Sequence, residues 1–168
     1  YNYEENFWSI GSLERYSWIA AGVFEKPIAA GEASSTKFIY EHEKGFNNDT
    51  DSMDGVFVES ADIDIADGDN YVFLKKVLPD ILFVNDIGTS QNGAVNIVLK
   101  RRDFSNQTLS TDSTTQITAS STFGSLRSRG RQFVLRFESD DDNSEGDRKN
   151  YKWRLGNTRV EIQPSGRR

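Results

Sequence analysis

Apolar and polar side chains alternate with a period of two residues along several stretches of this chain. No stretch keeps the 3.6-residue period of a helix over three turns. The clearest alternation lies in VFVESADIDI at residues 56–65 and in RQFVLRFES at residues 131–139. Successive side chains of a strand point to opposite faces, so this period predicts half-buried strands rather than helices. Many short strands joined by Gly and Asn turns are typical of an antiparallel sandwich or a distorted barrel.

Two regions differ in their pattern. Short aromatic segments broken by turns occupy residues 1–52, and longer strand-like segments occupy residues 53–168. We predict an all-β protein, with a propeller-blade-like antiparallel strand unit over 1–52 and a β-sandwich-like C-terminal domain over 53–168. The aromatic pairs of the first region recur at spacings near ten and twenty residues: Phe7 with Trp8, Tyr16 with Trp18, and Phe38 with Tyr40.

Three stretches of the second region are predicted to have simple local structures. Residues 56–65 are expected to form one strand, and YKWRLGNTRVEIQPSGRR at 151–168 is expected to form a closing hairpin. The stretch RSRGRQFVLRFES at 127–139 keeps a period of two throughout. In one extended strand that period places six side chains on the same face, half cationic and half apolar: Arg127, Arg129, Arg131, Phe133, Leu135 and Phe137.

Composition excludes some classes of protein and leaves others open. The chain has no cysteine, so it contains no disulfide, thiolate zinc site or cysteine nucleophile. The sequence contains no run of about 18 apolar residues, so it predicts no membrane span. The first residues lack the features of a signal peptide. The net charge of −6 is uneven: residues 1–99 hold 17 acids and 6 bases, whereas residues 100–168 hold 9 acids and 14 bases. The two parts are expected to attract opposite partners or each other, or to be ordinary solvated surfaces.

Residues for catalysis or metal binding are scarce. The single histidine, His42, lies between Glu41 and Glu43 without a recognisable nucleophile, and we interpret it as a surface histidine at a strand end. We therefore predict no catalytic site, no cofactor and no enzyme activity. The spacing of the acids in DIDIADGDN does not fit an EF-hand loop, and a turn is favoured over a calcium site. The weak metal candidates are Asp62, Asp64, Asp67 and Asp69.

The arginines near the C-terminus allow three interpretations. They suit phosphate binding, pairing with carboxylates of the acidic part or of a neighbouring subunit, or protection of an exposed sheet edge. RSRGR lacks the interleaved aromatic residues of a single-strand nucleic-acid binder, so pairing across an interface between subunits or domains is favoured. The interface candidates are Arg127, Arg129, Arg131, Arg154 and Arg159.

Several segments in order resemble the C-terminal part of virion proteins of short-tailed bacteriophages. The most specific are ESADIDIADGDN, RGRQFVLRFES and WRLGNTRVEIQPSGRR, and the similarity spans nearly the whole chain. The family is that of tail hub or nozzle proteins, also called packaged-DNA stabilization proteins. The resemblance implies a structural protein of the virion tail, made in the host cytoplasm. It also implies a fold of β-propeller and β-sandwich elements.

The partners implied by this resemblance are other copies of the chain in a ring, commonly sixfold, the portal and adaptor above it, and a fibre or needle beside it. DNA is implied only transiently, in the lumen of the genome conduit. Members of the family are several times longer, and this chain begins with Tyr1 inside an aromatic pattern. We therefore expect it to be a fragment of a longer protein.

Alternative functions come from other classes. The main alternative is a carbohydrate-binding β-sandwich, in which Trp8, Trp18 or Trp153 would stack on sugar rings. These residues lie within strand patterns among apolar neighbours, so they are expected in the core instead. A nucleic-acid-binding module and a hydrolase are further alternatives.

Overall fold

The computed structural model describes most of the chain, and the fold is stated for the described residues only. These contain thirteen β-strands and no helix, and hence no helix long and apolar enough to cross a membrane. The chain divides into an N-terminal unit, Tyr1–Gly45, and a C-terminal unit, Phe46–Arg168. The expected boundary between residues 52 and 53 lies outside the described residues. The described residues are 1–4, 6, 8–33, 35–46, 55–64, 70–85, 93–140 and 151–166.

The N-terminal unit is a three-stranded antiparallel sheet in the order β1-β2-β3. Its strands are β1 (Arg15–Ile19), β2 (Ile28–Ala33) and β3 (Thr36–Glu41). Residues 8–14, which include Trp8 of the first aromatic pair, have no strand. Gly31 stands in the central strand because β1 comes very close: a Cβ atom there would lie 2.4 Å from the carbonyl oxygen of Glu14.

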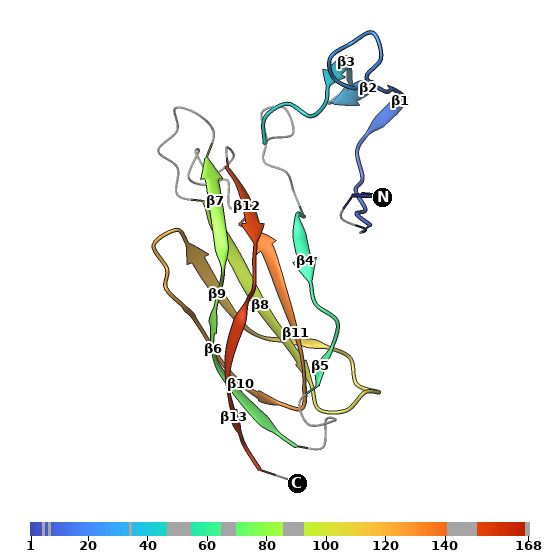
Figure 1. Cartoon of the computed structure of the whole chain (residues 1–168). Coiled ribbons are helices and arrows are strands. Elements are labelled where there is room, and N and C mark those ends of the chain that lie inside the picture. The colour runs from blue at the N-terminus through green and yellow to red at the C-terminus, as the bar shows by residue number, and fades with distance from the viewer. Residues whose placement is uncertain are drawn as a thin grey trace. The chain divides into compact units, whose positions relative to one another are not determined.

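The C-terminal unit is an antiparallel β-sandwich of two layers, as the alternation predicted (Figure 1). The first layer, here called the large sheet, has the order β4-β11-β8-β9, with β5 also paired to β11. The second, here called the small layer, consists of the sheet β10-β6-β13 and the two-stranded ribbon β7-β12. The strands of the large sheet are β4 (Phe57–Glu59), β5 (Ile63–Asp64), β8 (Ala94–Arg102), β9 (Ser110–Thr118) and β11 (Gln132–Ser139). Those of the small layer are β6 (Val72–Leu78), β7 (Ile81–Asn85), β10 (Gly124–Gly130), β12 (Tyr151–Leu155) and β13 (Arg159–Pro164).

The hydrophobic core lies between the two layers. Both layers contribute every second residue of their strands, as expected for strands with one buried face. Side chains from the ribbon β7-β12, such as Phe83 and Trp153, pack against the same cluster. Its buried members are Val72, Leu74, Val77, Val95, Ile97, Leu99, Ile117, Leu126, Phe133, Leu135 and Phe137.

The arginine-rich stretch at 127–139 forms two strands, so the prediction of one strand was wrong. The chain leaves β10 of the small layer at Gly130 and enters β11 of the large sheet at Gln132, with Arg131 at the corner. In β10 the exposed Arg127 and Arg129 alternate with buried neighbours. Phe133, Leu135 and Phe137 are buried from the other layer, so they do not share a face with the arginines.

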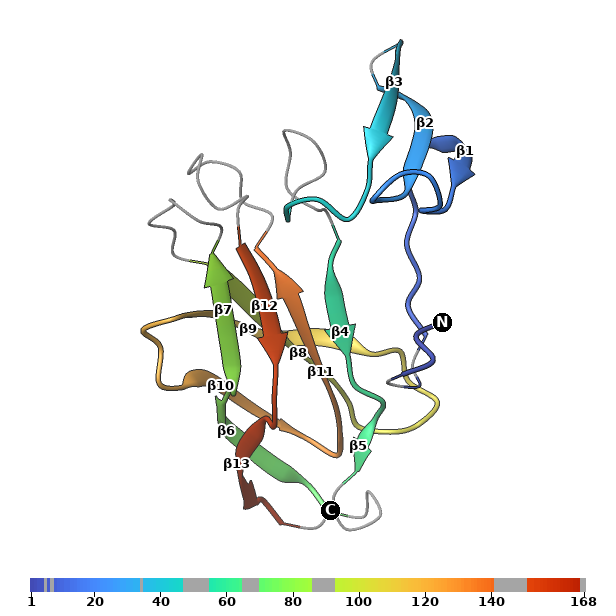
Figure 2. The same cartoon turned by 45° about the horizontal axis from the view of Figure 1, so that its top comes forward.

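The prediction of a closing hairpin at 151–168 was also wrong, because β12 and β13 pair with other strands and not with each other. β12 pairs with β7, and β13 pairs with β6, so residues 72–85 and 151–164 run side by side as one long bent ribbon (Figures 1 and 2). At the bend, Pro79 and Asp80 face residues 156–158. Asp80 holds this bulge: its carbonyl oxygen accepts the N–H of Gly156 at 2.7 Å, and its Oδ2 accepts the N–H of Asn157 at 3.3 Å.

The predicted strand at 56–65 is broken into β4 and β5. Both pair with β11, but the five steps from Glu59 to Asp64 face only four steps from Arg136 to Gln132, which is a β-bulge. Ser60 stabilises it. Its N–H donates to the carbonyl oxygen of Leu135 at 2.9 Å, and its Oγ accepts the N–H of Leu135 at 3.1 Å.

Candidate interaction surface on the small layer

The outer face of the small layer is strongly basic. The five strands of this layer contain seven cationic side chains and one acidic one, Glu161. Strand alternation turns the cations of β10, β12 and β13 outward, because their neighbours pack into the core. The adjacent Lys75 and Lys76 of β6 both face Glu161, at a point where the register of β6 with its two partner strands shifts. We call this surface the cationic face. It consists of Lys75, Lys76, Arg127, Arg129, Lys152, Arg154 and Arg159.

The single acid of this face is shared between two lysines. Glu161 contacts the Nζ of Lys76 at 3.0 Å and the Nζ of Lys75 at 3.8 Å. The hydrogen bond and charge of Lys76 lower the pKa of Glu161, with Lys75 adding to the effect. Arg127, Arg154 and Arg159 form no ion pair within the described part of the chain. Most of the positive charge of this face is therefore uncompensated there.

The large sheet differs, because its strands hold equal numbers of acids and bases. Four acids stand against four bases in β4, β5, β8, β9 and β11. All four bases are in ion pairs. Lys100 contacts Glu59 at 2.5 Å and Arg136 contacts Glu138 at 2.6 Å, while Arg101 and Arg102 pair with Asp112 and Asp62. The bases of the large sheet are thus all paired, and among the described residues the small layer is the one that carries unpaired positive charge.

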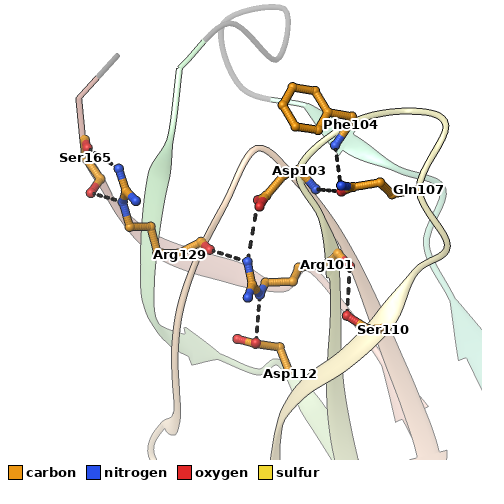
Figure 3. A network of polar contacts seen from close by, with 8 residues as sticks. All are labelled: Arg101, Asp103, Phe104, Gln107, Ser110, Asp112, Arg129 and Ser165. Carbon is orange, nitrogen blue, oxygen red and sulfur yellow. Dashed lines mark hydrogen bonds and ion pairs between the residues drawn. The ribbon is translucent and has the colours of Figure 1, made fainter. Parts of the chain in front are cut away.

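A polar network at one end of the sandwich holds Arg129 in place (Figure 3). The Nε of Arg129 donates to Ser165 Oγ at 2.9 Å, and its Nη2 donates to the Ser165 carbonyl oxygen at 3.2 Å. The Arg129 carbonyl oxygen accepts Nη1 of Arg101 at 3.0 Å. The guanidinium of Arg129 also lies 4.2 Å from the centre of the Tyr71 ring. This end of the cationic face is therefore fixed by β8, by β10 and by Ser165, which follows β13.

Arg101 is the hub of that network (Figure 3). Its Nε donates to Asp112 Oδ1 at 2.7 Å, and its Nη1 lies 3.5 Å from Asp103 Oδ1. The hydrogen bond from Arg101 to Asp112 raises the pKa of Arg101 above its already high value. Burial alone would raise the pKa of Asp112, but the nearby Ser128 and the hydrogen bond and positive charge of Arg101 outweigh it and lower that pKa.

The Asp112 carboxylate is expected to make stability depend on pH. Because its pKa is lowered on folding, its contribution is present above the ordinary value of 3.8 and is lost as the pH falls through the lowered pKa. We expect Asp112→Asn to reduce the free energy of unfolding by about 1 kcal/mol at neutral pH, and by less at pH values below the lowered pKa. Urea unfolding of both proteins at neutral and acidic pH measures this, and Asp103→Asn, which removes the longer contact, is the control. A difference that stays constant with pH would contradict the assignment.

The structure brings four of the five predicted interface arginines onto one face. Arg127, Arg129, Arg154 and Arg159 belong to the cationic face, although they come from three strands. Arg131 instead lies at the corner before β11, with its guanidinium 4.9 Å from the Tyr71 ring centre and 5.0 Å from that of Phe104. Sequence reasoning missed Lys75, Lys76 and Lys152. The alternation of YVFLKKVL and YKWRL contains them, but only the strand order shows that they join the arginines.

The candidate metal ligands do not form a cluster that the structure can confirm. Asp67 and Asp69, like the acidic run 141–147, lie outside the described residues. Asp62 is bound to Arg102, and Asp64 pairs in β5 with Gln132. Within the ranges that are described, no three His, Asp or Glu side chains gather to hold a metal ion.

His42 follows β3 in the N-terminal unit and is partly buried. Its Nε2 accepts a hydrogen bond from Arg15 Nε at 3.4 Å, and its ring centre lies 4.3 Å from that of Trp18. Burial and the positive charge of Arg15 lower the pKa of His42, against a smaller opposite effect of Glu43. The neutral imidazole is thus favoured, as the acceptor of the Arg15 hydrogen bond.

The tryptophans divide between core and surface. Trp153 packs against the core, and its Nε1–H donates to Ser139 Oγ at 2.9 Å, as expected. Trp8 and Trp18 are 78% and 55% exposed, so their assignment to the core was wrong. The N-terminal unit has a single sheet layer, and one ring contact on each, from Tyr1 on Trp8 and from His42 on Trp18, leaves these side chains largely exposed.

Comparison with known proteins leaves the chain without an assigned family. No protein-family model matches it, and no curated protein matches it significantly.

Proposed function

We propose that this chain is a non-catalytic, structural part of a multi-subunit assembly. Its place is the one that the sequence resemblance implies: the hub or nozzle of a short-tailed phage tail, below the portal and adaptor. There it forms part of the genome conduit and stabilises the packaged DNA. The observation that supports this proposal is the cationic face, with seven cations against one acid, beside a large sheet whose bases are all paired.

The charge distribution suits such a role. Arginine forks bind carboxylates with two parallel hydrogen bonds, and Arg127, Arg154 and Arg159 are exposed for this. A conduit must also let DNA pass without holding its phosphates, and the acid excess of residues 1–99 would repel them if it faces the lumen. The cationic face then serves contacts between proteins rather than contacts with DNA.

The test is the oligomeric state of the full chain. We expect light scattering after size exclusion to give a mass well above the 19.0 kDa of one chain, and negative-stain images to contain rings. The association should weaken as salt is added, because exposed charges are screened beyond about 10 Å at 0.1 M salt. A monomer at every concentration, with no rings, would refute the proposal.

A carbohydrate-binding module is the second candidate, and one observation favours it. Trp8 and Trp18 are exposed, and the Trp8 ring centre lies 4.8 Å from that of Tyr1. Exposed aromatic faces of this kind stack on sugar rings. Binding on a glycan array that is lost in Trp18→Ala would favour this candidate, whereas ring formation without glycan binding would favour the assembly role.

A further inference from the structure

The N-terminal unit exposes far more apolar surface than it buries. Twelve large apolar side chains of this unit are exposed, while Ala29 is the only apolar residue that is fully buried in its described part. Together they expose on the order of 1,500 Å². One partner of a standard protein interface contributes roughly 800 Å². The exposed apolar side chains of the N-terminal unit include Tyr16, Trp18, Val23, Phe38 and Ile39.

Both faces of the β1-β2-β3 sheet carry part of this surface: Trp18 and Phe38 lie on one face, and Ile39 lies on the other. The register places Trp18, Ala29 and Tyr40 side by side, and two steps along the sheet Gly31 pairs with Phe38. Aromatic side chains of the two outer strands thus flank small residues of the central strand. A sheet with one apolar face becomes stable when a second layer covers that face. The N-terminal unit needs such a cover.

The charge of this unit is opposite to that of the cationic face. Residues 1–45 contain seven acids and four bases, and Glu14 and Glu25 are exposed. The cationic face in turn has exposed apolar side chains between its cations, Leu78 on β6 and Leu82 and Val84 on β7. The two surfaces are complementary in charge, since one is acidic and the other basic. Both also have exposed apolar side chains that can pack against each other.

We propose that the N-terminal unit of one copy docks on the cationic face of a second copy. This inference rests on the proposed assembly function and names the two surfaces that meet. The contact joins two different surfaces, so it is heterologous, and repeating it closes a ring or extends a filament. A protein partner fits better than nucleic acid, because the face includes apolar side chains and the chain as a whole has a net charge of −6.

A reciprocal charge swap in the full chain tests this docking. Arg127→Glu/Arg154→Glu reverses two charges of the cationic face and leaves five cations against three acids on its strands. Glu14→Lys/Glu25→Lys leaves five acids against six bases in residues 1–45. We expect each variant alone to associate at least roughly tenfold more weakly than the wild-type chain, as judged from the mass by light scattering. An equimolar mixture of the two variants should recover association, because the unchanged N-terminal unit of the first variant then meets the unchanged cationic face of the second.

The control has the same change in net charge as the reversed face but a different location. Lys37→Glu/Lys44→Glu makes the N-terminal unit more acidic, and we expect it to keep or strengthen association. Lys44 pairs with Glu41 at an exposed site, so little stability is lost. Far-UV circular dichroism verifies that all variants are folded.

The other outcomes separate the two proposals. If both charge variants form the same oligomers as the wild type, or if their mixture does not recover association, this docking is overturned and the assembly role remains. A wild-type chain that is monomeric and instead binds a single-stranded oligonucleotide, with affinity falling steeply in salt and lost in Arg127→Glu/Arg154→Glu, would overturn both.

Discussion

Phe133→Ala is expected to reduce the free energy of unfolding of the C-terminal unit by about 3–5 kcal/mol. Phe133 is 1% exposed and belongs to the core cluster between the two layers. Its ring also packs on Gly130, where a Cβ atom would lie 3.3 Å from two ring carbons. The substitution therefore leaves a cavity at the corner where the chain passes from one layer to the other.

Urea unfolding measures this loss, with Trp153 as the fluorescent reporter. The chain has three tryptophans, so a Trp8→Phe/Trp18→Phe background leaves only the one in the C-terminal unit. We expect the midpoint to fall while the slope stays the same, since a lower midpoint at constant slope reports a change in stability. Phe123→Ala is the matched control, because Phe123 is 54% exposed and its loss should cost less than about 1 kcal/mol. Equal effects of the two substitutions would show that Phe133 is not a core residue.

The class of fold could be predicted because alternation records burial directly. A residue of a strand faces either the core or the solvent, and QFVLRFES shows this, because Phe133, Leu135 and Phe137 are buried while Arg136 and Glu138 are not. VFVESADIDI alternates as well, but its Val56, Phe57 and Val58 are exposed. The sheet to which a strand belongs is different information. It depends on which distant segment forms its hydrogen bonds, and this leaves no trace in the spacing of apolar residues.

The arginine-rich stretch illustrates the limit. The period of two runs from Arg127 through Arg131 to Phe133 without a break, so no spacing signal marks the corner. The break occurs because Gly130 lets the backbone approach the Phe133 ring closely, and the following strand pairs with β8 instead of β6. A glycine inside a strand pattern was the one available sign.

The closing segment shows the same limit for pairing. YKWRLGNTRVEI looks like a hairpin because Gly156 and Asn157 separate two strand patterns. The partners of these strands lie 66 to 92 residues earlier, in β6 and β7, and Asp80 holds the connecting bulge. The cationic face depends on this pairing. Its arginines could be named from the sequence, but its lysines join them only through the order of the strands.

Gly93→Ala is expected to separate the ribbon β7-β12 from the sandwich and to reduce the free energy of unfolding by about 2–3 kcal/mol. A Cβ atom at this buried position would lie 2.6 Å from Tyr151 Cδ2 and 2.7 Å from Phe83 Cδ1. Neither ring can move without cost. The hydroxyl of Tyr151 donates to the carbonyl oxygen of Ala94 at 2.6 Å, and Phe83 packs against the core.

The ribbon also supports the cationic face, because β12 holds Lys152 and Arg154. Gly93→Ala should therefore weaken association together with stability, whereas Phe83→Leu in the same chain makes room and should recover part of both. Gly11→Ala is the control, since nothing lies within 4 Å of a Cβ atom there and a glycine of ordinary φ tolerates alanine. Urea unfolding and light scattering measure the two effects. A Gly93→Ala chain as stable as the wild type would contradict the packing of the two rings over residue 93. It would also contradict the anchoring of Lys152 and Arg154 through this packing.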